Sequence, residues 1–230
     1  MCIRDRGNTV RLFLQWGEGL PAQHLDMDLS CQVSYESRNV HCSYSRLTIG
    51  GCQHSGDIQQ IPNKVGTAEY IDVNVNQLSR LGAKYVTFAC NAYTNGSLAP
   101  NLVVGWMNSK FPMKISKKGV AYNPSDVQHQ VRITKTLNKG MVFGVLDIEA
   151  REVIWLELAF GGQVVQNLDT NNVEALLNKL EAKLKIGDLL ELKAKCQELE
   201  IVEDSSNADE MYDAKWALNT ADVSALFLNE

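Results

Sequence analysis

The sequence predicts a mostly β protein, an antiparallel two-sheet β-sandwich with a C-terminal helical extension. Between residues 10 and 160, apolar residues alternate with polar or small ones, as in Leu29, Cys31 and Val33, which is typical of half-buried strands. Stretches rich in Gly, Asn, Ser and Pro separate these runs. Because no helical pattern lies between the runs, an antiparallel sandwich is favoured over a parallel sheet.

The alternation predicts about nine strands, separated by turn-forming residues. The last two are joined across Glu149 and Ala150 and are expected to form a hairpin. The predicted strands span residues 10–16, 27–35, 40–46, 69–75, 84–92, 101–107, 130–135, 141–148 and 151–160.

Beyond Gly161 and Gly162 the apolar period becomes that of a helix. The pattern predicts one helix over residues 172–185 and, after the glycine at 187, a second over 189–199. We therefore expect three parts along the chain. They are a β-sandwich domain over 7–165, a helical hairpin over 166–200 that packs on or extends the sandwich, and an acidic linker with a C-terminal segment over 201–230.

Composition narrows the class of partner. The 22 basic and 27 acidic side chains give a net charge of −5, which does not attract the phosphate backbone of a nucleic acid. The apolar runs are far shorter than the roughly 20 residues that cross a bilayer, and the N-terminus has no secretory signal pattern. We expect a cytoplasmic protein that is not an integral membrane protein. The first six residues, MCIRDR, fit no following element and resemble translated sequencing adaptor, so we expect a different native N-terminus.

The six cysteines contain no CxxC pair, so reduced thiols are expected. A zinc site remains an alternative, because several Cys and His residues fall close together in the sequence. Their spacing matches no common zinc module, and cysteines in alternating strands usually serve as small buried apolar residues. The residues concerned are Cys31, His41, Cys42, Cys52 and His54.

Two acidic segments interrupt the β pattern. Asp26 and Asp28 share one side of a strand start, and such like charges need solvent, protons or a cation. Asp57 follows Gly56 in a loop whose carbonyl groups can turn inward. Carboxylate and carbonyl oxygens are the ligands of Ca²⁺. The alternative is that Asp26 and Asp28 simply begin a strand while Asp57 caps a turn.

Four ordered motifs are similar to the TerD family of tellurite-resistance and stress-response proteins. They are LDMDLS at 25–30, HSGD at 54–57, EYIDVNV at 69–75 and KGMVFGVLDIEAREVIWLELAFGGQ at 139–163. The resemblance runs from about Leu12 to Gln163. Within it, Asp26, Asp28 and Ser30 match a DLDAS-like segment, and Gly56 and Asp57 match a GDN segment in which Ile58 replaces the Asn. The last motif matches the family's hairpin through Met141, Val142, Phe143, Gly144 and Leu146. Trp155 stands at the position where the family usually has a tryptophan.

The resemblance implies a β-sandwich that binds Ca²⁺ through acidic loops and acts with a protein partner in a bacterial stress-response or tellurite-resistance system. It implies Asp26, Asp28, Asp57 and Glu69 as the metal ligands. The family's acidic stretch before the strand reads KVGTAE here, at 64–69, so only Gly66 and Glu69 remain. Because calcium affinity depends on ligand charge, we expect a partly degenerate, weakened site.

No residue pattern indicates an enzyme. The four histidines, at 24, 41, 54 and 129, are scattered, and no nucleophile elbow, P-loop or dinucleotide glycine motif is present. Metal-assisted hydrolysis stays a minor alternative, because His24 and His54 lie near acidic segments. The main alternative to a calcium-binding module is a metal-independent protein-interaction domain of a larger bacterial stress-response protein.

Overall fold

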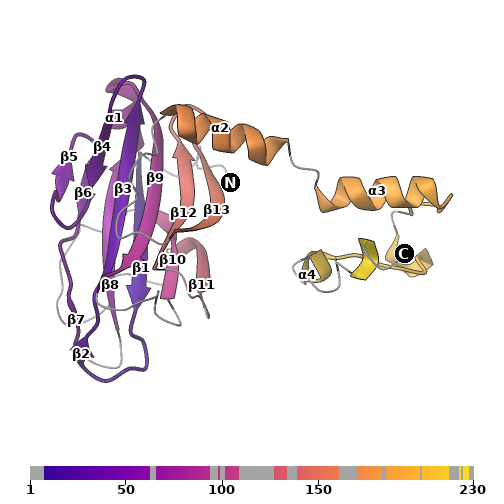
Figure 1. Cartoon of the computed structure of the whole chain (residues 1–230), viewed down its shortest axis with the longest axis horizontal. Coiled ribbons are helices and arrows are strands. Elements are labelled where there is room, and N and C mark those ends of the chain that lie inside the picture. Colours follow the sequence, from indigo (N-terminus) through magenta and orange to yellow (C-terminus); the bar gives the residue numbers. More distant parts are fainter. Residues whose placement is uncertain are drawn as a thin grey trace. The chain divides into compact units, whose positions relative to one another are not determined.

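Figure 1 shows the computed structural model of the chain. Its residues form two compact units, Met1–Glu174 and Ala175–Glu230. The residues that the structure describes are 8–62, 66–93, 98, 102–108, 127–133, 139–160, 170–182, 185–202, 204–217, 223 and 225–227.

The first unit is built from two large antiparallel sheets and one small one. The larger sheet has the order β11-β10-β1-β8-β6-β5, the second β13-β12-β9-β3-β4, and the small one pairs β2 with β7. The larger sheet comprises β1 (Thr9–Trp16), β5 (Thr48–Ile49), β6 (Cys52–His54), β8 (Thr67–Asn74), β10 (Leu102–Asn108) and β11 (Val127–Ile133). The second comprises β3 (Met27–Tyr35), β4 (Asn39–Cys42), β9 (Ala83–Ala92), β12 (Gly140–Asp147) and β13 (Glu152–Phe160), and the small sheet β2 (Gln23–His24) and β7 (Gln60–Ile61).

The two large sheets pack face to face, as the alternation predicts (Figure 1). Leu12 and Ile71 from the larger sheet belong to the same buried cluster as Leu29, Val33 and Phe88 from the second. All of them are fully buried. The predicted mostly β sandwich is therefore confirmed.

Each of the nine predicted strands has a counterpart. The strand predicted over 27–35 has the same bounds as β3, and the other eight differ at one or both ends. The strand predicted over 40–46 ends at Cys42, because Ser43 and Arg46 form a tight turn with two mutual backbone hydrogen bonds. The strand predicted over 69–75 ends at Asn74, whose side chain accepts the N–H of Gln77. Asn74 thereby caps a short helix, α1 (Val75–Arg80), that the sequence pattern did not predict.

The predicted helices are present as α2 (Thr170–Glu181) and α3 (Ile186–Cys196). The hydroxyl of Thr170 donates to the carbonyl oxygen of Tyr35 at 2.6 Å, which ties the start of α2 to β3 in the first unit. The second unit also contains a 3-10 turn, Ser205–Asn207, and α4 (Ala214–Ala217). None of the described helices is long and apolar enough to span a bilayer.

Some expectations lie outside these observations. The division at residues 165 and 200, and a hairpin of the two helices, stay predictions. Residues 1–6, the segment at 64–65 and the glycines at 161–162 lie outside the described residues.

A glycine-to-alanine change tests the packing of β12. A Cβ on Gly144 would lie 2.7 Å from ring carbons of Phe88 and 3.0 Å from the carbonyl oxygen of Ile154. We expect Gly144→Ala to lower the free energy of unfolding by about 1–3 kcal/mol, because the sheet must shift to admit the methyl group. Urea unfolding measures this. Gly187→Ala is the matched control, because an added Cβ there meets no described atom within 4 Å. Equal losses in both variants would contradict the expectation.

Candidate metal centre

Three carboxylates converge at one end of the sandwich. One oxygen each from Asp26, Asp28 and Asp57 lies within 4.8 Å of the other two. Asp28 lies on β3, Asp26 precedes that strand, and Asp57 follows β6 of the other large sheet. Asp26 and Asp28 are 3% and 5% exposed, whereas Asp57 is exposed. Among the described residues, these three are the only group of His, Cys, Asp or Glu close enough to hold a metal ion together.

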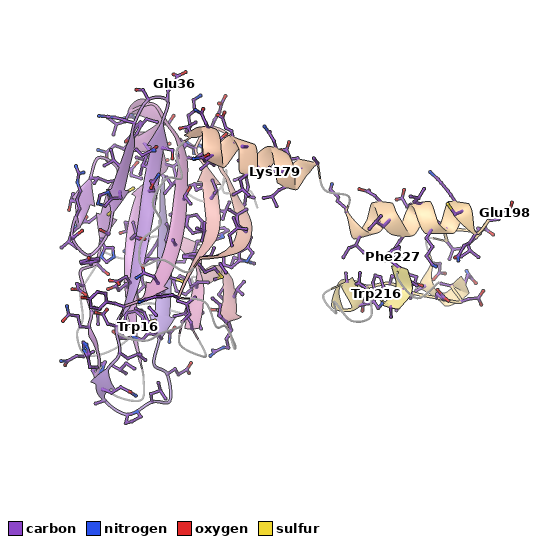
Figure 2. All side chains as sticks on the ribbon, in the orientation of Figure 1. Trp16, Glu36, Lys179, Glu198, Trp216 and Phe227 are labelled. Carbon is purple, nitrogen blue, oxygen red and sulfur yellow. The ribbon has the colours of Figure 1, made fainter. Side chains whose placement is uncertain are left out.

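Neighbouring groups fix the segment that carries Asp26 and Asp28. The indole N–H of Trp16 donates to the carbonyl oxygen of Leu25 at 2.8 Å, and the N–H of Tyr93 donates to that of Asp26 at 3.1 Å. Trp16, which donates the first of these bonds, is labelled in Figure 2 at the opposite end of the sandwich from Glu36. The side-chain amide of Asn91 donates to Asp28 Oδ2 at 3.2 Å. Two of the three carboxylates therefore sit on a firmly bonded strand start.

The loop that carries Asp57 is tied to β8. The N–H of Ser55 donates to the carbonyl oxygen of Tyr70 at 2.8 Å, and the N–H of Tyr70 donates to Ser55 Oγ at 2.9 Å. Gly56 then adopts φ of 113°, a conformation that favours glycine. The amide of Gln59 donates to Asp57 Oδ2 at 2.9 Å. This backbone turn places Asp57 beside the other two carboxylates.

Glu69, the fourth predicted ligand, is placed differently. It is fully buried on β8, and it is not one of the three carboxylates that converge. Its Oε2 accepts the N–H of Leu29 at 2.8 Å, and its Oε1 accepts the N–H of Ile58 at 3.0 Å. The structure therefore brings together three of the four predicted residues, whereas the fourth, Glu69, accepts hydrogen bonds from the adjoining backbone.

His54 bonds to the same stretch of β3. Its Nε2 donates to the carbonyl oxygen of Leu29 at 2.9 Å and lies 3.5 Å from Glu69 Oε2. The N–H of Gly56 donates to Nδ1 at 3.0 Å, which places the ring proton on Nε2 of the neutral ring. The sequence shows a histidine near an acidic segment but does not indicate this role, because the partners of His54 in these bonds are backbone groups.

Burial and mutual repulsion raise the pKa values of the two buried aspartates. Burial, followed by the charges of Asp57 and Glu69, raises the pKa of Asp26 to about 6. Burial, followed by the charges of Glu69, Asp26 and Asp57, raises the pKa of Asp28 to about 7, against the opposing hydrogen bond from Asn91. Burial also raises the pKa of Glu69, although the bonds from His54 and two backbone amides oppose it. Near neutral pH, the cluster thus holds negative charge that its own surroundings disfavour.

The cysteines do not form a comparable centre. Cys31 lies directly opposite Cys42 on β4, and its thiol interacts with those of Cys42 and Cys52 inside the core. All three are free and buried, and hydrogen bonding with the Cys42 and Cys52 thiols, followed by burial, raises the pKa of Cys31. Both ring nitrogens of His54 already bond to backbone groups. The zinc alternative therefore gains no ligand cluster among the described residues.

The donor set at the acidic cluster is made only of carboxylate oxygens. Such a set suits a hard cation such as Ca²⁺, whereas zinc prefers histidine and thiolate ligands. No protein-family model matches the chain, and no curated protein matches it. The resemblance to the TerD family therefore stays a prediction that the sequence motifs carry.

The raised pKa values predict how the stability of the ion-free protein depends on pH. The folded protein binds protons at Asp26 and Asp28 more tightly than the unfolded chain, in which the pKa of each is near 3.8. The stability that these two groups contribute is therefore fully present below about pH 4, and it is lost as the pH rises through about 6 to 7. Melting temperatures in chelator should fall between about pH 5 and pH 8.

The variant Asp28→Asn should reduce that fall, because it removes one of the repelling charges. Its melting temperature at about pH 8 should exceed that of the wild type in chelator. A wild-type protein that is equally stable or more stable at the higher pH would contradict the assigned shifts.

Proposed function

We propose that this protein is a TerD-like calcium-binding module of a bacterial stress-response or tellurite-resistance system, which acts in the cytoplasm by binding a protein partner. The observation that carries the proposal is the convergence of Asp26, Asp28 and Asp57 within 4.8 Å at a strand start and a neighbouring loop. These are three of the four residues that the family resemblance implies as ligands. The proposal makes the protein a binding module and not an enzyme.

The chemistry of the cluster fits a divalent cation. Two of the carboxylates are buried and have raised pKa values, so an adjacent positive charge would stabilise their ionised forms. Asp26, Asp28 and Asp57 would supply carboxylate oxygens, and Ca²⁺ accepts water and backbone carbonyl oxygens as its remaining ligands. Bound there, the ion would supply charge and a cross-link.

The origin of the three residues supports a structural effect of the ion. Asp28 belongs to β3 of the second sheet, while Asp57 follows β6 of the larger sheet. An ion held by both would add a further link between segments of the two sheets, at a loop that is already bonded to β8. A protein partner would then recognise the surface whose carboxylates the ion has neutralised.

Calcium titration into chelator-stripped protein tests this proposal. We expect saturable heat in the wild type and none in an Asp26→Asn, Asp28→Asn double variant. Calcium at 100 times Kd should stabilise the wild type by about 2.7 kcal/mol, a rise in Tm of roughly 5–10 °C. Asp209→Asn, which changes an exposed aspartate of the second unit, is the control and should bind as the wild type does.

The same titration distinguishes the alternatives. If millimolar calcium gives neither heat nor stabilisation, the calcium module is excluded and a metal-independent interaction domain takes its place. The erosion of the family's acidic stretch to KVGTAE at 64–69 is the feature that favours that alternative. Equal binding by the double variant would place the ion elsewhere and would also contradict the proposal.

A further inference from the structure

We propose that Glu69 is a positioning residue of the cation site and not one of its ligands, and that it acts with His54 by holding the backbone beside Asp28 and Asp57. This inference rests on the proposed function. It differs from the ligand role that the sequence motif suggests for Glu69.

The hydrogen bonds of Glu69 fall next to the converging carboxylates. Leu29 directly follows Asp28, and Ile58 directly follows Asp57. One oxygen of Glu69 accepts the N–H of Leu29 at 2.8 Å and the other accepts that of Ile58 at 3.0 Å. A single carboxylate thus fixes the separation between the two segments that bring the aspartates together.

The arrangement of the strands explains why Leu29 is open to such a bond. In the second sheet, β4 pairs with β3 only from Cys31 to Ser34, so Leu29 lies beyond its last residue, Cys42. Glu69 supplies an acceptor for the N–H of Leu29, and His54 supplies a donor for its carbonyl group. Side chains from β8 and β6 of the larger sheet therefore continue the hydrogen bonding that β4 leaves off.

Burial and occupancy argue against direct coordination by Glu69. Its side chain is fully buried, and each oxygen already accepts a backbone N–H. It stands outside the group of three carboxylates whose oxygens lie within 4.8 Å of one another. Its negative charge still adds to the field that attracts a cation, but its bonds go to the protein backbone.

Residues that orient metal ligands typically contribute 10–100-fold to metal affinity. We therefore expect Glu69→Gln to weaken calcium binding by about 10–100-fold, because an amide group can accept only one of the two backbone N–H groups. His54→Gln, which keeps a donor for Leu29 but loses the acceptor for Gly56, should weaken binding to a smaller extent. It also keeps the test open if the Glu69 variant does not fold.

Hydrogen exchange in the ion-free protein separates positioning from ligation. In Glu69→Gln, the amides of Leu29 and Ile58 should lose protection, while that of Val33, which pairs with Val40, should keep it. Asp57→Asn is the matched control. It removes a converging carboxylate, so it should weaken calcium binding and leave the protection of Leu29 and Ile58 unchanged.

Terbium luminescence provides a second readout, since its decay in H₂O and D₂O reports the water molecules on the bound ion. That number should match the wild type in Glu69→Gln and should rise in Asp57→Asn. Wild-type affinity in Glu69→Gln, lost affinity without a change at the two amides, or extra water on terbium in that variant would each overturn the inference. If the wild type binds neither ion, the proposed function fails and the positioning role falls with it, whereas altered exchange would still show that the Glu69 bonds exist.

Discussion

The acidic end of the sandwich depends on the hydrogen bonds of one buried carboxylate, that of Glu69, to the backbone of β3 and of the loop after β6. A carboxylate in a dry interior is strongly unfavourable unless donors surround it. Here two backbone amides and the nearby His54 ring meet that need. Because these donors belong to β3, to the loop after β6 and to β6 itself, satisfying the charge also fixes how the two sheets meet at this end.

The surrounding aspartates show that this end is not arranged for stability alone. Asp26 and Asp28 are buried among like charges, and their pKa values rise to about 6 and about 7 as a result. A core built only for packing would place apolar residues at such positions, as the large buried cluster between the sheets does. Departures of this kind are expected at functional sites, where local destabilisation accompanies a ligand's binding.

The sequence was a good guide to the long strands and a poor one to the short elements. Strands such as β3 and β9 show enough alternating residues to reveal their period, whereas two-residue strands such as β5 contain no period at all. Helix α1 was missed because its six residues follow directly from β8, and only the cap at Asn74 marks the change.

For the site, the spacing of Asp26 and Asp28 and the motif around Asp57 indicated residues that do converge. The sequence could not tell that Glu69 turns toward backbone amides. A ligand carboxylate and a backbone-bonding carboxylate are the same residue type, and their roles separate only once β4 is seen to end at Cys42. The sequence did not indicate the role of His54 either, because its partners are backbone groups of Leu29 and Gly56.

The division of the acidic residues between the two sheets has a consequence for how the chain acquires its native state. Residues 26–28 and 57 come together only after strands far apart in sequence have docked, so a partly synthesised or partly collapsed chain lacks the complete cluster. An ion that needs all three carboxylates would bind late on the folding pathway. It would then act chiefly by slowing the opening of the finished sandwich, with little influence on how fast that sandwich first assembles.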